Sequence, residues 1–380
     1  MKQKISGKQM VATIVMFLTG SSLITGAYTA AGRDTWLCGI FAFFLVIPMM
    51  LVHSAILNLY PGRNYYANIL TACGKWAGRA AALYLFLCSM FLVSLVLRDF
   101  CEFIHIVNMV ETPVPVIAAC ILGVAIYLLK KGAYVLARVS RFALPFLLIS
   151  IALTCVLAIK DMEFSNLLPI LQAGPEKLAE GTAMIFFLPM GEITACSSLF
   201  KWMDPKEKVF PVFFRGVLGA LLFLLAANLR NLLVLGNSIA AFLYPSYEAV
   251  SVVAIGQFFT RIEVLIGINL MLAGFIKCCV LLHNACEALG AVFNLDGSTP
   301  RSRAPLVAPC ALLVFTGSMV IFATSEERAA WTNYTPLASV LGQVLIPVAV
   351  LAAGKIRARR KGRGGPKPAR PSRARTAPQP

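Results

Sequence analysis

The chain has 380 residues, of which 59% are hydrophobic and only 13% are charged. This composition excludes an ordinary soluble protein, because runs of about 20 apolar residues recur along the chain and that length crosses a hydrocarbon core about 30 Å thick. The runs are long and unbroken, so they do not fit the alternating segments of about 10 residues that build a membrane β-barrel. We therefore expect an all-α polytopic membrane protein.

The formal net charge of +17 is concentrated near the C-terminus. Ten of the 34 lysines and arginines lie in residues 355–380, a segment with five prolines and no aromatic residue. We expect this segment to be a disordered cytoplasmic tail, which either contacts anionic lipid headgroups or only fixes the topology. Because the basic residues are gathered in a tail of this kind, we expect no nucleic-acid partner.

Hydropathy predicts ten transmembrane spans within residues 1–354. Most basic residues outside the tail fall in connections on the same side as both termini, so we expect both termini to be cytoplasmic. The fourth span is short, and a re-entrant segment there would invert the orientation of everything after it. The predicted spans are residues 8–31, 36–60, 79–108, 114–129, 139–159, 181–200, 209–236, 255–287, 305–323 and 336–354.

Two unusual features of these spans repeat with a period of five. The first and sixth spans are interrupted by helix-breaking residues, and the third and eighth are unusually long. This is the pattern of an inverted-repeat transporter, with one repeat at about residues 8–159 and the second at about residues 181–354. We therefore expect a ligand site at the bilayer midplane, where the two broken helices meet.

The first interruption is Gly20-Ser21-Ser22. A break there would offer backbone N–H groups, two hydroxyls and the positive end of a half-helix to a carboxylate. The alternative interpretation is that Gly20 and Ser21 are small residues that allow close helix packing.

The second interruption is Leu188-Pro189-Met190-Gly191. Pro189 removes a backbone donor, and the freed carbonyls could accept from an ammonium group. Alternatively, Pro189 makes a simple kink. Taken together, the two interruptions predict a site for a zwitterion, most simply an amino acid.

Glu192 follows the second interruption directly, and a carboxylate at that depth in a membrane is costly. Four roles are open: counter-ion for a ligand amine, proton carrier in coupled transport, ion-pair partner of Lys277, or cap of the broken helix. Lys277 in the eighth span either replaces a bound cation or extends its ammonium group to the membrane surface. Asn269 is the polar residue of the same span that we expect to face the centre.

No motif in the sequence predicts an enzyme or a bound cofactor. Walker A, G-x-G-x-x-G and G-x-S-x-G sequences are absent. The eleven cysteines and three histidines have no metal-ligand spacing, so we expect buried thiols and no metal site.

Short motifs along the chain resemble those of the spore germination permeases, the B subunits of GerA-type germinant receptors (the GerAB/GerKB group). The resemblance covers the membrane region to about residue 354 and excludes the tail. The chain departs from the family at Leu188, where proline is frequent, and at Arg33, where an uncharged residue is common. The motifs are Lys4-Ile5-Ser6 with Gln9, Gly20-Ser21, Ala31-Gly32-Arg33-Asp34-Thr35-Trp36, and Phe187-Leu188-Pro189-Met190-Gly191-Glu192.

The resemblance implies a LeuT-like fold of the amino acid, polyamine and organocation transporter superfamily. It also implies a protein of the spore inner membrane that binds a small germinant, commonly an amino acid, and works with an A subunit and a lipoprotein C subunit. We therefore expect a germinant sensor that signals to these subunits. The alternative is a proton-coupled secondary amino acid transporter in which Glu192 carries the proton.

Overall fold

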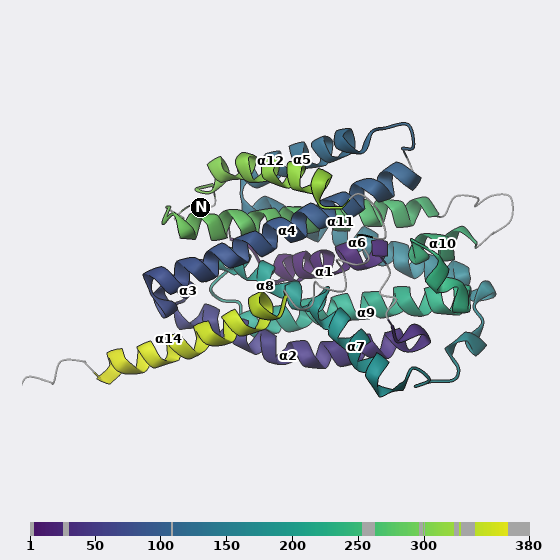
Figure 1. Cartoon of the computed structure of the whole chain (residues 1–380), viewed down its shortest axis with the longest axis horizontal. Helices are drawn as coiled ribbons and strands as arrows, with labels where there is room; N and C mark the ends of the chain where they lie inside the picture. Colours follow the sequence, from purple (N-terminus) through teal and green to yellow (C-terminus); the bar gives the residue numbers. More distant parts are fainter. Residues whose placement is uncertain are drawn as a thin grey trace, which may run out of the picture.

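The computed structural model describes residues 4–25, 30–107, 109–252, 263–295, 299, 301–322, 327 and 339–363. In this part of the chain the regular structure is helical, apart from one isolated backbone bridge between Ile5 and Met203. The long helices lie side by side in one bundle, and α1 runs through its middle (Figure 1). The prediction of an all-α protein is confirmed.

The helices follow one another with short connections. The first half contains α1 (Gly7–Thr25), η1 (Gly32–Asp34), α2 (Thr35–Leu59), α3 (Tyr65–Cys73), α4 (Lys75–Val107), α5 (Val114–Lys131) and α6 (Ala133–Leu157). The second half begins with η2 (Ala158–Asp161), η3 (Phe164–Leu167), α7 (Gly174–Phe187), η4 (Met190–Glu192), α8 (Ile193–Cys196) and η5 (Ser197–Trp202). It continues with α9 (Val209–Leu235), η6 (Gly236–Ala241), α10 (Pro245–Ser251), α11 (Glu263–Val292), α12 (Ala304–Val320), the π-helix η7 (Val340–Leu345) and α14 (Ile346–Arg363).

Eight helical segments of the described residues are long and apolar enough to cross a membrane. They confirm an integral membrane protein, and α5 is a full-length member of the set, which argues against a re-entrant fourth span. The 19-residue α1 and the 17-residue α12 occupy the places of the two other predicted spans without belonging to the eight. The count of ten therefore stays a prediction. The eight segments are Gly32–Leu59, Lys75–Val107, Val114–Lys131, Ala133–Asp161, Gly174–Trp202, Val209–Ala241, Ile266–Val292 and Val340–Arg359.

The two long spans are confirmed, since α4 has 33 residues and α11 has 30. These two helices pack along each other, and α1 packs against α11. The helix of the last predicted span continues beyond residue 354, because α14 runs to Arg363. The helix therefore includes the first basic residues of the predicted tail, and residues 364–380 lie outside the described part.

The predicted break at Gly20-Ser21-Ser22 is wrong at that position, because α1 is helical from Gly7 to Thr25. Gly20 has a packing role instead. A Cβ atom there would lie 2.7 Å from the backbone oxygen of Ala273 and 3.0 Å from Cβ of Lys277, both in α11. The absence of a side chain thus lets α1 and α11 approach closely. Residues 26–29, which complete the predicted span, lie outside the described residues.

The turn before α2 explains one family motif. The Asp34 carboxylate accepts hydrogen bonds from the backbone N–H groups of Leu171 and Ala173 at 2.9 and 3.0 Å. Arg33 donates to Asn237 Oδ1 at 2.7 Å. Both charged residues therefore connect distant parts of the chain, and Arg33 has a structural role.

The close contact at Gly20 predicts that Gly20→Ala lowers the stability of the protein and that Gly123→Ala does not. Gly20→Ala places a methyl group against the α11 backbone, and we expect a loss of about 1–3 kcal/mol from overpacking. Gly123→Ala, in α5, meets nothing within 4 Å and keeps or slightly raises stability. Thermal unfolding of the purified variants in detergent measures both effects, and equal melting temperatures would contradict the packing role of Gly20.

Candidate functional site

The second predicted break is confirmed. α7 ends at Phe187, Leu188 is extended, and the chain resumes through the short helices η4, α8 and η5. Pro189 accounts for this geometry, because the residue before a proline is driven out of the helical region and proline itself has no N–H to continue the ladder. The break therefore forms with leucine at position 188.

Gln343, near the C-terminal end of the sequence, provides a hydrogen bond to a backbone carbonyl group that the break leaves without a helical partner. Gln343 Nε2 donates to the Phe187 carbonyl oxygen at 3.1 Å. Gln343 lies in η7, and π-helical turns are frequent at functional sites. Gly191 makes this approach possible, since a Cβ atom at Gly191 would overlap the Gln343 amide oxygen. The break and η7 therefore form one unit.

Glu192 and Lys277 form an ion pair inside the bundle, with side chains that are 1% and 0% exposed. The Lys277 ammonium also lies 5.3 Å from the ring centre of Phe17 in α1. Of the four roles considered for Glu192, the structure shows the ion pair with Lys277. The alternative in which Lys277 extends its ammonium group to the membrane surface is wrong, because its side chain is fully buried against Glu192 and Phe17.

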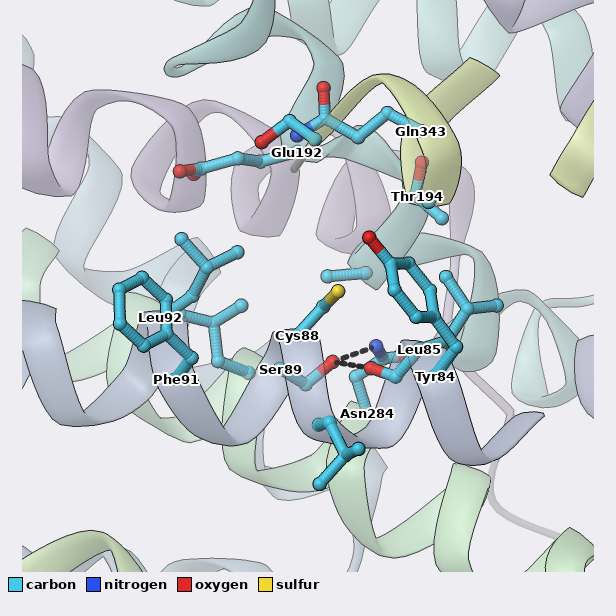
Figure 2. A pocket seen from close by; sticks show the side chains of 15 residues that line it. Tyr84, Leu85, Cys88, Ser89, Phe91, Leu92, Glu192, Thr194, Asn284 and Gln343 are labelled. Carbon is cyan, nitrogen blue, oxygen red and sulfur yellow. Dashed lines mark hydrogen bonds between the residues drawn. The ribbon is translucent and has the colours of Figure 1, made fainter. Parts of the chain in front are cut away.

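A cavity of about 340 Å³ adjoins the break. Figure 2 shows Glu192 and Gln343 on one side of it, facing Cys88 and Ser89 of α4 on the other. The size is that of a site for a small ligand, and the predominantly apolar wall with a few polar groups is typical of such sites. The lining residues are Tyr84, Leu85, Leu87, Cys88, Ser89, Phe91, Leu92, Glu192, Thr194, Ala195, Leu281, Asn284, Ser339, Gly342 and Gln343.

The polar groups of the cavity are held in place by hydrogen bonds. Asn284 Nδ2 donates to Ser89 Oγ at 2.9 Å, which joins α11 to α4. The Thr194 hydroxyl lies 3.1 Å from His53 Nε2, and His53 Nδ1 lies 3.2 Å from the Tyr65 hydroxyl. His53 thus connects the cavity wall to α3 through a buried hydrogen-bond network.

Among the predicted site residues whose side chains the structure describes, only Glu192 lines the cavity. Lys277 lies behind it in the ion pair, and Gly20 lies at the contact of α1 with α11. Asn269 is buried in α11 but is not part of the cavity wall. The side chains of Ser21 and Ser22 lie outside the described residues. The remaining predicted residues form the break itself: Leu188, Pro189, Met190 and Gly191.

Most of the cavity wall was not predicted from the sequence. Tyr84, Cys88 and Leu92 are spaced four apart, which places them on one face of α4, and this spacing is the signal that could have found them. Gln343 is a polar residue within an apolar span, which by itself indicates a functional position.

Solved structures of transporters share this fold. The chain superposes on Mhp1, a nucleobase-cation-symport-1 family transporter with bromovinylhydantoin bound, with a TM-score of 0.68 at 13% identity, covering 94% of this chain and 80% of that one. For MhsT in complex with L-phenylalanine the TM-score is 0.64 at 14% identity, covering 92% and 89%. The fold and the interrupted helix therefore define a helical membrane protein with the LeuT-like fold.

The sequence narrows this class to one family. The family model described as "Spore germination protein" matches residues 4–328. Spore germination protein KB of Bacillus subtilis (strain 168) is 24% identical over 375 residues, which cover 96% of this chain and 98% of that protein. The chain belongs to the spore germination protein family, as its motifs predicted.

The buried ion pair predicts that substitutions of Glu192 and Lys277 have strongly non-additive effects on the free energy of unfolding. Lys277→Met leaves a buried carboxylate without its partner, and we expect a loss of about 3–5 kcal/mol. The double variant Glu192→Gln/Lys277→Met removes both charges and recovers most of that loss. A double-mutant cycle measured by thermal unfolding gives the coupling.

The exposed pair of Lys4 with Asp204, 3.6 Å apart, is the matched control. Lys4→Met should cost less than about 1 kcal/mol, because solvent screens that interaction. Additive effects of the Glu192 and Lys277 substitutions would show that the two charges do not depend on each other.

Proposed function

We propose that the chain is the germinant-sensing B subunit of a spore germination receptor, with a small nutrient bound beside the interrupted helix. The observation that carries the proposal is the convergence of Glu192 and Gln343, from two distant segments, on a cavity of about 340 Å³ next to the break. Membership of the spore germination protein family supports the sensing role. The two transporter structures, each with a small organic ligand, support a ligand of similar size.

The chemistry of the cavity fits an amino acid with an apolar side chain. The Glu192 carboxylate can share its charge between Lys277 and a ligand ammonium group. Gln343 Oε1 is buried and has no hydrogen-bond partner within the described part of the chain, so it can accept from the same ammonium group. Leucine side chains at 85, 92 and 281 provide apolar walls. The Asn284 amide and the Tyr84 hydroxyl lie on the opposite wall, where donors can meet a carboxylate.

The contacts of α14 supply a route for the signal. Gln343 in η7 bonds the break, and α14 continues directly from η7. Further along this helix, Arg357 donates to the backbone oxygen of Thr71 at 2.6 Å, at the end of α3. A ligand that moves the break would therefore move α14 relative to α3. We propose that this movement is transmitted to an A subunit and a lipoprotein C subunit in the spore inner membrane, with both termini of this chain cytoplasmic.

A cavity-filling substitution tests the ligand site. Wild-type protein in detergent should gain thermal stability with one or a few apolar amino acids, by about 2.7 kcal/mol at 100 times the dissociation constant, and not with nucleosides or sugars. Cys88→Phe fills the cavity from α4 and should remove that gain while leaving the ligand-free melting temperature nearly unchanged. Cys120→Phe, at an exposed position of α5, is the control. A full ligand effect in Cys88→Phe would place the site elsewhere.

The second candidate function is proton-coupled amino acid transport, favoured by the transporter fold and the buried carboxylate of Glu192. The two functions differ in whether the protein moves the amino acid across a membrane. As a sensor, the protein in liposomes should bind the amino acid without accumulating it under an inward proton gradient. Accumulation that is abolished in Glu192→Gln would instead establish transport with Glu192 as the proton carrier.

A further inference from the structure

Two adjacent residues at the start of α3, Tyr65 and Tyr66, are buried although each carries a hydroxyl group. The helix that they begin lies at one end of the bundle, where it packs against α4 (Figure 1). None of the residues of α3, all of which the structure describes, lines the cavity beside the break. Hydrogen bonds from the two hydroxyl groups nevertheless lead to that cavity by two separate routes.

Tyr65 is connected to the break through His53 of α2. The Thr194 hydroxyl donates to the Gly191 backbone oxygen at 3.2 Å, so its own oxygen accepts from His53 Nε2 at 3.1 Å. Nδ1 of the same ring is then the acceptor, and the Tyr65 hydroxyl donates to it at 3.2 Å. The Ser197 hydroxyl lies farther from Nδ1, at 3.5 Å. Because Thr194 lines the cavity, this route ends at the wall on the side of the break.

Tyr66 is connected to the wall built by α4 and α11. Its hydroxyl donates to Asn284 Oδ1 at 3.0 Å, and Asn284 Nδ2 donates to Ser89 Oγ at 2.9 Å (Figure 2). The Ser89 hydroxyl in turn donates to the Leu85 backbone oxygen at 2.8 Å. Asn284 and Ser89 both line the cavity, so the second route reaches it from the side of α4.

The position of α3 does not depend on these two hydroxyl groups. Asn64 caps the helix by accepting from a backbone N–H group of its first turn at 3.1 Å. Asn68 Nδ2 donates to the Ile56 backbone oxygen at 3.1 Å. A buried hydroxyl group needs a partner, which explains why each tyrosine has one, but not why the two routes end on different walls of one cavity. The anchored helix can therefore hold the cavity side chains in place.

We propose that Tyr65 and Tyr66 are positioning residues of the ligand site, through which α3 holds the two cavity walls at the spacing that the ligand needs. The inference rests on the proposed function, because it concerns the same cavity. A ligand that contacts both walls acts on the same hydrogen bonds, so ligand binding and the stability of α3 are coupled. Such coupling is reciprocal: a contribution of α3 to ligand affinity equals a contribution of the ligand to the stability of α3.

The test is amide hydrogen exchange, measured by mass spectrometry, over a peptide of residues 64–74 that contains α3. The probe is the one of L-alanine, L-valine, L-leucine and L-phenylalanine that raises the melting temperature of the wild type most. Saturation with this amino acid should slow exchange in the peptide at least about fivefold, the low end of couplings between distinct sites. Tyrosines that only stabilise the fold would leave exchange in α3 independent of the amino acid.

Tyr65→Phe/Tyr66→Phe removes both hydroxyl groups and keeps both rings, which contact each other edge to face. The double variant should bind the same amino acid at least about fivefold more weakly, and at saturation the amino acid should no longer slow exchange in α3. Tyr60→Phe is the matched control, because Tyr60 is half-buried close to the same helix and contacts Arg63 through its ring. The control should keep the affinity and the exchange protection of the wild type.

The single variants separate the two routes and serve if the double variant folds poorly. Tyr66→Phe leaves Asn284 Oδ1 without its donor, whereas after Tyr65→Phe the Ser197 hydroxyl can still donate to His53. Tyr66→Phe should therefore weaken binding more than Tyr65→Phe does. The exchange measurement on the wild type needs no variant at all.

The outcomes distinguish this inference from the proposed function. Thermal stabilisation by none of the four amino acids would overturn both. Stabilisation that is lost in Cys88→Phe, with exchange in α3 unchanged by the amino acid, would overturn only the role of α3. Unchanged affinity in the double variant, or equal losses in the double variant and in Tyr60→Phe, would overturn it as well.

Discussion

The structure depends on one constraint: charges and unpaired backbone groups inside a membrane must be satisfied by the protein itself. The pairing of Glu192 with Lys277 meets that requirement for the charges. It joins the interrupted helix to α11, and the Lys277 ammonium lies against Phe17 of α1. An isolated buried charge costs several kcal/mol. The ion pair therefore opposes any separation of the interrupted helix from α11.

The need to satisfy unpaired backbone groups also determines which side chains line the cavity. An interrupted helix exposes carbonyl groups that lipid cannot satisfy, and the Gln343 amide meets one of them at Phe187. This bond places Gln343 on the cavity wall beside Glu192. The side chain that satisfies the break, that of Gln343, thus also lines the cavity beside it, together with Glu192.

The sequence predicted the fold class, the long spans and the break at Leu188 to Gly191, because proline and a buried carboxylate have few interpretations inside an apolar run. Gly20 was ambiguous, since a glycine in a span either breaks a helix or admits a neighbour, and only the position of α11 decides between them. Gln343 and the α4 face could not be assigned to one cavity from the sequence, because their convergence depends on how helices far apart in the chain pack.

The π-helical turn η7 has a consequence for the register of α14. A π turn contains one residue more in each hydrogen-bonded ring than an α turn does. If residues 340–345 adopted α-helical bonding, the chain after them would rotate by about 100° and shift by about 1.5 Å along its axis. Gln343, within the turn, would then be displaced relative to Phe187, and Arg357 would be displaced relative to the end of α3. A one-residue change of register in this turn would thereby switch the contacts at both ends of the helix together.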